Sequence, residues 1–123
     1  MASLFLDTNI FIDIGESRES ELHSRLDGNE LFVSVLSIAN WIYIYKHTVP
    51  SSKYSQLFEK FNLIDMTEDL VSKSLIGPTA DFEDNVQLHS ASEAECILFL
   101  TKDEELLKLG YFGNVRILDS LPV

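Results

Sequence analysis

The sequence contains a single cysteine, Cys96, and only nine basic residues among its 123 positions. One cysteine cannot close a disulfide within the chain, which argues against a disulfide-framed secreted domain and favours a reducing, cytoplasmic location. The nine lysines and arginines stand against 20 acidic residues, so the formal net charge is −11. A protein this acidic has no general attraction to phosphate backbones, and we do not expect it to bind nucleic acid through charge alone.

Long hydrophobic runs are also lacking. The longest stretch without a charged residue, 31–45, is shorter than the roughly 20 residues of a membrane-spanning helix, and it includes the polar Asn40. The N-terminus has no basic region and reaches an acid at Asp7, which argues against a signal peptide. We therefore expect no membrane segment. Cys96 lies in an apolar run, where a small core residue is the expected role rather than a nucleophile.

What is present is the composition of a globular protein. Hydrophobic residues make up 46% of the chain, and its length predicts one domain over residues 1–123. Short apolar runs alternate with stretches of helical periodicity, which predicts an α/β sandwich of three layers, α/β/α, around a mostly parallel central sheet. The predicted strands are 4–6, 31–33, 63–66, 96–100 and 115–118; the predicted helices are 9–14, 21–26, 35–46, 50–61, 68–76, 81–93 and 104–109, with Ser34 and Thr67 as helix N-caps.

Three acidic residues fall at the carboxyl edge of this predicted sheet. Asp7 ends the first strand, Asp103 follows the strand 96–100, and Asp84 lies in the first turns of the helix that leads into that strand. Ligands of such sheets bind at the carboxyl ends of the strands, so we expect the three carboxylates to converge. Converging carboxylates raise each other's pKa, and a hard divalent cation such as Mg²⁺ or Mn²⁺ removes that cost. A metal held in this way suits phosphodiester hydrolysis by an activated water.

Each of these acids also has a purely structural interpretation. An aspartate after a strand commonly caps a helix or forms a turn, which would account for Asp7 and Asp103. A carboxylate in the first turn of a helix, such as Asp84, is stabilised by the helix dipole. Capping and metal binding are compatible roles, so both interpretations stay open at this point.

The segments around the three acids resemble the motifs of PIN-domain ribonucleases. Residues 4–9, Leu-Phe-Leu-Asp-Thr-Asn, resemble the opening motif of that family, and residues 81–85, Asp-Phe-Glu-Asp-Asn, resemble its second signature. Residues 101–103, Thr-Lys-Asp, resemble the motif after the fourth strand, and 115–118 followed by Pro122 is similar to the closing strand. The resemblance extends over essentially the whole chain, with the motifs in the family's order.

The resemblance implies a PIN-like fold and a Mg²⁺- or Mn²⁺-dependent endoribonuclease that acts on RNA. It makes Asp7, Asp84 and Asp103 the catalytic, metal-binding carboxylates, with Thr8 and Asn9 shaping the site through hydrogen bonds. It further implies a cytoplasmic toxin of a type II toxin–antitoxin pair, which forms a homodimer and is neutralised by a small antitoxin protein. The opening segment is also similar to that of haloacid dehalogenase-type phosphatases, but Asn9 stands where those enzymes need a second aspartate.

One position departs from the PIN pattern. The family usually carries a glutamate in the helix after the second strand, where this chain has Asn40, as in a PIN subgroup. Asparagine keeps an oxygen ligand but removes a negative charge, so Asn40 is expected to assist the site with weaker metal affinity, unless it is a buried amide bonded to backbone. Glu83 is expected to point about 100° away from Asp84 around the helix and to be a poor substitute. The departure keeps a second hypothesis open, a catalytically weak or inactive protein-binding module.

A chain this acidic would have to hold RNA through local contacts. Aromatic side chains at positions 41, 43 and 45 could stack on bases, although such residues in an apolar helix more often belong to a core or a dimer interface. The histidines, at positions 23, 47 and 89, lack the spacing of a zinc site and are expected on the surface or in packing roles. The candidates for phosphate contacts are Lys46, His47, Lys53, Lys102 and Arg116.

Overall fold

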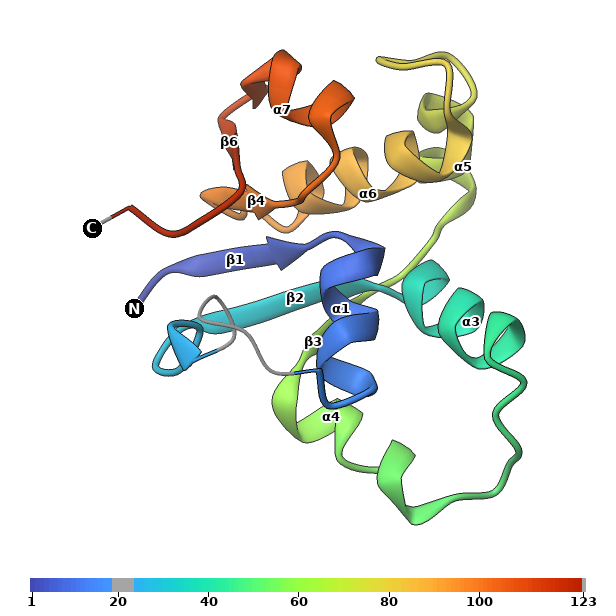
Figure 1. Cartoon of the computed structure of the whole chain (residues 1–123). Coiled ribbons are helices and arrows are strands. Elements are labelled where there is room, and N and C mark those ends of the chain that lie inside the picture. Colours follow the sequence, from blue (N-terminus) through green and yellow to red (C-terminus); the bar gives the residue numbers. More distant parts are fainter. Residues whose placement is uncertain (19–23, 123) are drawn as a thin grey trace.

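The structure is a computed structural model that describes residues 1–18 and 24–122 (Figure 1). Its centre is a six-stranded sheet in the order β3-β2-β1-β4-β6-β5. The strands are β1 (Ser3–Leu6), β2 (Glu30–Ser34), β3 (Asn62–Ile64), β4 (Leu98–Leu100), β5 (Tyr111–Phe112) and β6 (Val115–Leu118). β5 pairs with β6 in the antiparallel sense, and the other pairings are parallel. The predicted α/β class with a mostly parallel sheet is therefore confirmed.

Helices cover both faces of this sheet (Figure 1). They are α1 (Thr8–Gly15), α3 (Val35–Ile44), the 3-10 helix η1 (Ser52–Tyr54), α4 (Leu57–Lys60), α5 (Glu68–Ser74), α6 (Phe82–Glu93) and α7 (Glu104–Leu109). Alternation along β1 divides the core, because Leu4 and Leu6 pack against α1, α3 and α4, whereas Phe5 packs against α6. Phe5 stacks on Phe99 of the neighbouring strand at 5.3 Å between ring centroids. The sheet is thus buried on both sides, as parallel sheets require.

Some predicted boundaries need correction. The single helix expected over 50–61 is divided into η1 and α4. Leu57 and Phe61 lie four residues apart and are buried, whereas Phe58 is 75% exposed. The strand expected over 96–100 begins only at Leu98, and β5 was not predicted. Half of the helix predicted over 21–26, residues 21–23 with His23, lies outside the described part of the chain, as does the Lys53 side chain.

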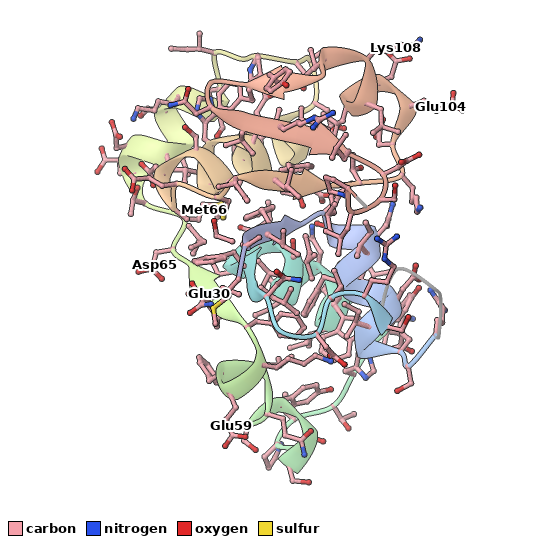
Figure 2. All side chains as sticks on the ribbon, turned by 90° about the vertical axis from the view of Figure 1, so that its left-hand side faces the viewer. Glu30, Glu59, Asp65, Met66, Glu104 and Lys108 are labelled. Carbon is pink, nitrogen blue, oxygen red and sulfur yellow. The ribbon has the colours of Figure 1, made fainter. Side chains whose placement is uncertain are left out.

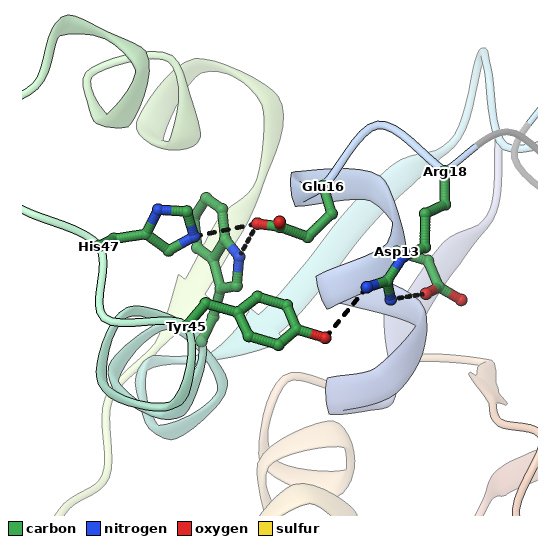
Figure 3. Close-up of polar contacts among 6 residues, drawn as sticks. Asp13, Glu16, Arg18, Tyr45 and His47 are labelled. Atoms are coloured by element: carbon green, nitrogen blue, oxygen red, sulfur yellow. Dashed lines mark hydrogen bonds and ion pairs between the residues drawn. The ribbon is translucent and has the colours of Figure 1, made fainter.

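The end of α1 is fastened to the end of α3 by polar contacts (Figure 3). The Glu16 carboxylate accepts a hydrogen bond from Trp41 Nε1 at 2.7 Å. It forms a second hydrogen bond with His47 Nε2 at 2.9 Å. Arg18 donates to Asp13 at 2.9 Å, and it also donates to the Tyr45 hydroxyl. Trp41 is buried, so it is a core residue and not a base-stacking one. These contacts fix the position of α3, the helix that carries Asn40.

The close approach of α1 and α3 needs a glycine. A Cβ atom added at Gly15 would lie 2.8 Å from Cζ2 of the Trp41 ring, which is closer than van der Waals contact permits. The absence of a side chain at this position therefore lets the indole reach Glu16.

The outer surface carries much of the negative charge. Glu30, Glu59, Asp65 and Glu104 project from the ribbon into solvent in Figure 2. None of the helices within residues 1–18 and 24–122 has the length and apolar composition that crossing a membrane requires.

Candidate active site

The site begins where β1 and β4 end side by side. Leu6 pairs with Leu100 in the parallel register, and the Asp7 N–H continues the pairing by donating to the Leu100 carbonyl at 3.0 Å. The residue after β1 therefore lies beside Thr101, the residue after β4. β1 has β2 on one side and β4 on the other, so this is also the point at which the strand order reverses. Open α/β sheets bind their ligands at such a point, outside the carboxyl ends of the strands.

Asp7 is held from two directions. Its Oδ1 accepts a 2.7 Å hydrogen bond from the Thr8 N–H, which makes it the N-cap of α1. Its Oδ2 accepts a 2.5 Å hydrogen bond from the Thr101 hydroxyl. The side chain is only 6% exposed, and this burial raises the pKa of Asp7 despite the hydrogen bonds that favour its charged form. A carboxylate fixed in this way is oriented, but its negative charge is poorly compensated.

Asp103 is connected to Asp7 by hydrogen bonds of Thr101. The Thr101 hydroxyl donates to Asp7 and accepts the N–H of Asp103 at 3.0 Å, so a single buried side chain connects the two acidic residues. Asp103 also caps α7 by accepting from the N–H groups of Glu105 and Leu106. The capping interpretation is therefore correct for Asp7 and for Asp103. It does not remove them from the site, because the Asp103 charge raises the pKa of Asp7.

Asp84 faces this edge from the first turn of α6. The helix is capped by Asp81, whose Oδ1 accepts the Asp84 N–H at 3.0 Å. The pKa of Asp84 is raised to about 7, first by partial burial and then by the charges of neighbouring carboxylates. Those neighbours include Asp7 and Asp103, which belong to two other segments of the chain. The charges of Asp7 and Asp103 therefore both act on Asp84.

The start of α6 is fixed by a buried asparagine. Asn85 donates to the carbonyls of Ser74 and Thr79 at 2.8 and 2.9 Å. Its Oδ1 accepts from the N–H and the hydroxyl of Thr79. These contacts tie the end of α5 and the loop before α6 to the first turn of α6. They therefore determine where Asp84 stands.

Asn40 contacts a side chain of the neighbouring helix. Its Nδ2 donates a 2.5 Å hydrogen bond to Oε2 of Glu83, across the gap between α3 and α6. Burial and the charges of Asp7 and Asp81 raise the pKa of Glu83, and hydrogen bonds from Asn40 and Thr8 oppose the rise. Although position 83 is turned about 100° from Asp84 around α6, Glu83 contacts Asn40, because α3 lies beside the first turn of α6 and meets position 83 there. The angle around one helix does not exclude a residue from a site that two helices share.

Gln87 is a site residue that the sequence analysis missed. It is completely buried, and its Oε1 accepts the Thr8 N–H at 2.8 Å, one residue from Asp7. Its amide also lowers the pKa of Asp7, although within the described residues Nε2 has no hydrogen-bond partner. A glutamine three residues after Asp84 and four after Glu83, and so on the same face of the predicted helix, was the available signal.

The donor set of the site is suited to a hard cation. Carboxylate and amide oxygens are the ligands that Mg²⁺ and Mn²⁺ prefer. As the side chains stand, no three His, Cys, Asp or Glu residues of the described chain lie close enough together to enclose one metal ion. Mg²⁺ does not need such a cage, because it commonly binds through one or two carboxylates and keeps several waters. The roles of Asp7, Asp84 and Asp103 as ligands, and of Asn40 as an assisting group, stay predictions.

Two comparisons with solved structures bear on the fold. No model of a protein family matches the sequence, and no curated protein is significantly similar to it. This chain is similar to a chain of VapBC2 from Rickettsia felis, which was solved bound to a DNA fragment from the VapBC2 promoter. The TM-score is 0.67 and the identity 14%, over 94% of this chain and 97% of that chain. A chain of a toxin–antitoxin complex from Klebsiella pneumoniae is similar with a TM-score of 0.68 and 15% identity, over 91% of this chain and 94% of that one.

This chain has a PIN-like fold. In this PIN-like arrangement the acidic residues named by the sequence motifs gather at one edge of the sheet, after β1, after β4 and at the start of α6. Two of the five basic candidates for RNA contact have partners within the chain. His47 bonds to Glu16 between α1 and α3, and Lys102 donates to the Asp119 carbonyl at 2.9 Å.

Proposed function

We propose that this protein is a metal-dependent endoribonuclease that hydrolyses RNA phosphodiester bonds with Mg²⁺ or Mn²⁺. One observation carries the proposal: beside the point where the strand order reverses, the charges of Asp7 and Asp103 both raise the pKa of Asp84, and the charge of Asp103 raises that of Asp7. Accumulated negative charge of this kind is unfavourable in the protein alone, and binding of a divalent cation would relieve it. The resemblance of the surrounding motifs to PIN-domain ribonucleases agrees with that chemistry.

The residues of the site would have different roles in this reaction. Asp7 and Asp103 would hold the cation, with Asp7 kept in place by Thr101 and by the Thr8 N–H. Asp84 would be a further ligand or would orient the attacking water, and Asn40 would assist from α3. A divalent cation bound here lowers the pKa of a water ligand and polarises a phosphoryl oxygen.

The test is hydrolysis of single-stranded RNA by the purified protein with Mn²⁺ or Mg²⁺, with and without a chelator. We expect cleavage that the chelator abolishes. Asp7→Asn should reduce the cleavage rate about a hundredfold or more, because the buried carboxylate that would bind the cation loses its negative charge. Asp65→Asn is the matched control, since Asp65 also follows a strand, β3, but is exposed to solvent. Equal cleavage by wild type and Asp7→Asn would contradict the proposal.

A second candidate function is a PIN-fold protein-binding module with little or no catalytic activity. The amide at Asn40, in a place where the resembling family has an acid, and the net charge of −11 favour it. Thermal unfolding with Mn²⁺ separates the two functions, because a ligand at 100 times its Kd stabilises the folded state by about 2.7 kcal/mol. No stabilisation of the wild type, or equal stabilisation of Asp7→Asn, would favour the binding module.

We also propose that the protein is a cytoplasmic toxin neutralised by an antitoxin protein and that it forms a homodimer. The similar solved chains support the antitoxin, since one belongs to VapBC2 and the other to a toxin–antitoxin complex. Large apolar side chains that are well exposed support protein contacts: Tyr43, Ile44, Val49, Phe58, Leu75 and Ile76. A small adjacent reading frame for a DNA-binding antitoxin, and a dimer in sedimentation experiments, are the expected findings.

A further inference from the structure

Glu83 is an acid of the site whose orientation is set by another helix. Its Oε2 accepts the 2.5 Å hydrogen bond from Asn40 Nδ2. A hydrogen bond from the Thr8 side chain also lowers the pKa of Glu83. The Thr8 hydroxyl in turn shares a 2.8 Å hydrogen bond with Ser37, one turn before Asn40 on α3. Side chains from α1, α3 and α6 therefore meet around one carboxylate.

The chemistry of the pair explains why an amide stands at position 40. An asparagine can donate through Nδ2, whereas a carboxylate at neutral pH only accepts. An acid at position 40 would face Glu83 with like charge and, while ionised, could not donate a hydrogen bond to it. The amide instead donates to the Glu83 carboxylate through Nδ2. The negative charge between α3 and α6 is thus supplied from α6.

A second observation indicates that the site is built to receive something. Gln87, four residues after Glu83 and on the same side of α6, is fully buried, and its Nε2 has no hydrogen-bond partner within residues 1–18 and 24–122. A buried amide donor without a partner costs free energy, and an ordered water or another acceptor at the site would satisfy it. Its Oε1 is fixed on the Thr8 N–H, which keeps the amide beside Asp7.

We propose that Glu83 is a fourth carboxylate of the cation site and that Asn40 is the positioning residue that directs it there. The inference rests on the proposed function, because it concerns the same site. Glu83 contributes one oxygen to the cation, directly or through a water, while Asn40 holds the other. The site then keeps four acidic groups, from β1, β4 and the start of α6, even though α3 supplies none.

Direct measurement of Mn²⁺ binding by calorimetry tests this inference without relying on activity. We expect Glu83→Gln to weaken binding about tenfold, because the charge is lost while the oxygen that accepts from Asn40 is kept. Glu93→Gln is the matched control, since it removes the same charge from the exposed far end of α6 and should leave the Kd unchanged. Asn40→Ala should weaken binding severalfold.

The double variant separates positioning from an independent effect. If Asn40 acts through Glu83, Asn40→Ala adds no further loss to Glu83→Gln, so the two effects are strongly non-additive. Fully additive losses would overturn the positioning role. Wild-type Mn²⁺ affinity in Glu83→Gln, together with a large loss in Asp7→Asn, would overturn this inference and leave the proposed function standing. Absence of Mn²⁺ and Mg²⁺ binding by the wild type would overturn both.

Discussion

Asp84 links the charge of the site to the stability of the fold. Its pKa is raised to about 7 in the folded chain from an ordinary value of 3.8. The folded state therefore binds this proton more tightly than the unfolded state does. Stability from this group is fully present below about pH 3.8 and is lost as the pH rises through about 7. At neutral pH and without metal, the site costs the protein part of its stability.

The first prediction concerns Asp84→Asn in the presence of a chelator. The variant should be more stable than wild type at pH 7.5 and nearly equal to it at pH 4, because asparagine has no charge to bury. The gain should be about 1 kcal/mol, well below the full effect of the pKa shift since the side chain is partly solvated. Thermal unfolding should show a rise in Tm of about 4 °C at pH 7.5. A lower Tm at pH 7.5, relative to the Asp65→Asn control, would contradict the pKa assignment.

Thr101 is the residue that joins two of the acids, and the second prediction concerns it. Thr101→Val removes the hydroxyl that donates to Asp7 and accepts the Asp103 N–H. The variant should lose about 2 kcal/mol of unfolding free energy at neutral pH, because a buried carboxylate loses its donor. Urea unfolding measures the loss. Thr101→Ser should restore most of it, and a valine variant as stable as wild type would show that this hydroxyl does not support the site.

At the scale of single elements, local signals were sufficient for the caps and insufficient for the site. Ser34 and Thr67 cap α3 and α5 as predicted, because an N-cap depends on the few residues that follow it. Glu83 and Asn40 are 43 positions apart, and their contact depends on how α3 and α6 pack. A pattern within one helix contains no information on that packing. The contact of Glu83 with Asn40 was therefore not predicted, although the helix itself was.

The third prediction tests the element contact that places α6. Asn85→Ala removes the hydrogen bonds that connect α6 to the Ser74 carbonyl and to Thr79. It should destabilise the protein by about 3 kcal/mol, since several buried polar groups lose their partners together. Asn62→Ala is the matched control, because Asn62 donates one hydrogen bond, to Leu31, from an exposed position. Chemical denaturation of the two variants gives the comparison.

A second measurement separates placement of α6 from general loss of stability. If Asn85 fixes the first turn of α6, Asn85→Ala should weaken Mn²⁺ binding at a temperature where the variant is fully folded. Unchanged Mn²⁺ affinity in the folded variant would mean that the site does not depend on this connection.

The architecture of the whole molecule followed from the order of its apolar segments. Three-residue runs such as 4–6 are too short for helices, and alternation with helical stretches leaves a parallel sheet as the favoured arrangement. The neighbouring carboxyl ends of β1 and β4 then bring Asp7 and Asp103 together. β5 was missed, because a two-residue strand that pairs across Gly113 has little pattern of its own. The division of 50–61 was missed because it depends on tertiary packing, which buries Leu57 and Phe61 and leaves Phe58 exposed.

The fourth prediction belongs to the molecule as a whole and follows from its net charge of −11. Acidic side chains such as Glu30, Glu59, Asp65 and Glu104 extend from several elements, so the folded state concentrates like charge (Figure 2). Without divalent metal, raising NaCl from 10 to 300 mM should increase Tm by a few degrees, because the screening length falls from about 30 Å to under 10 Å. Most of the increase should occur below about 150 mM, since screening saturates. A Tm that falls with added NaCl would mean that attractive ion pairs outweigh the repulsion.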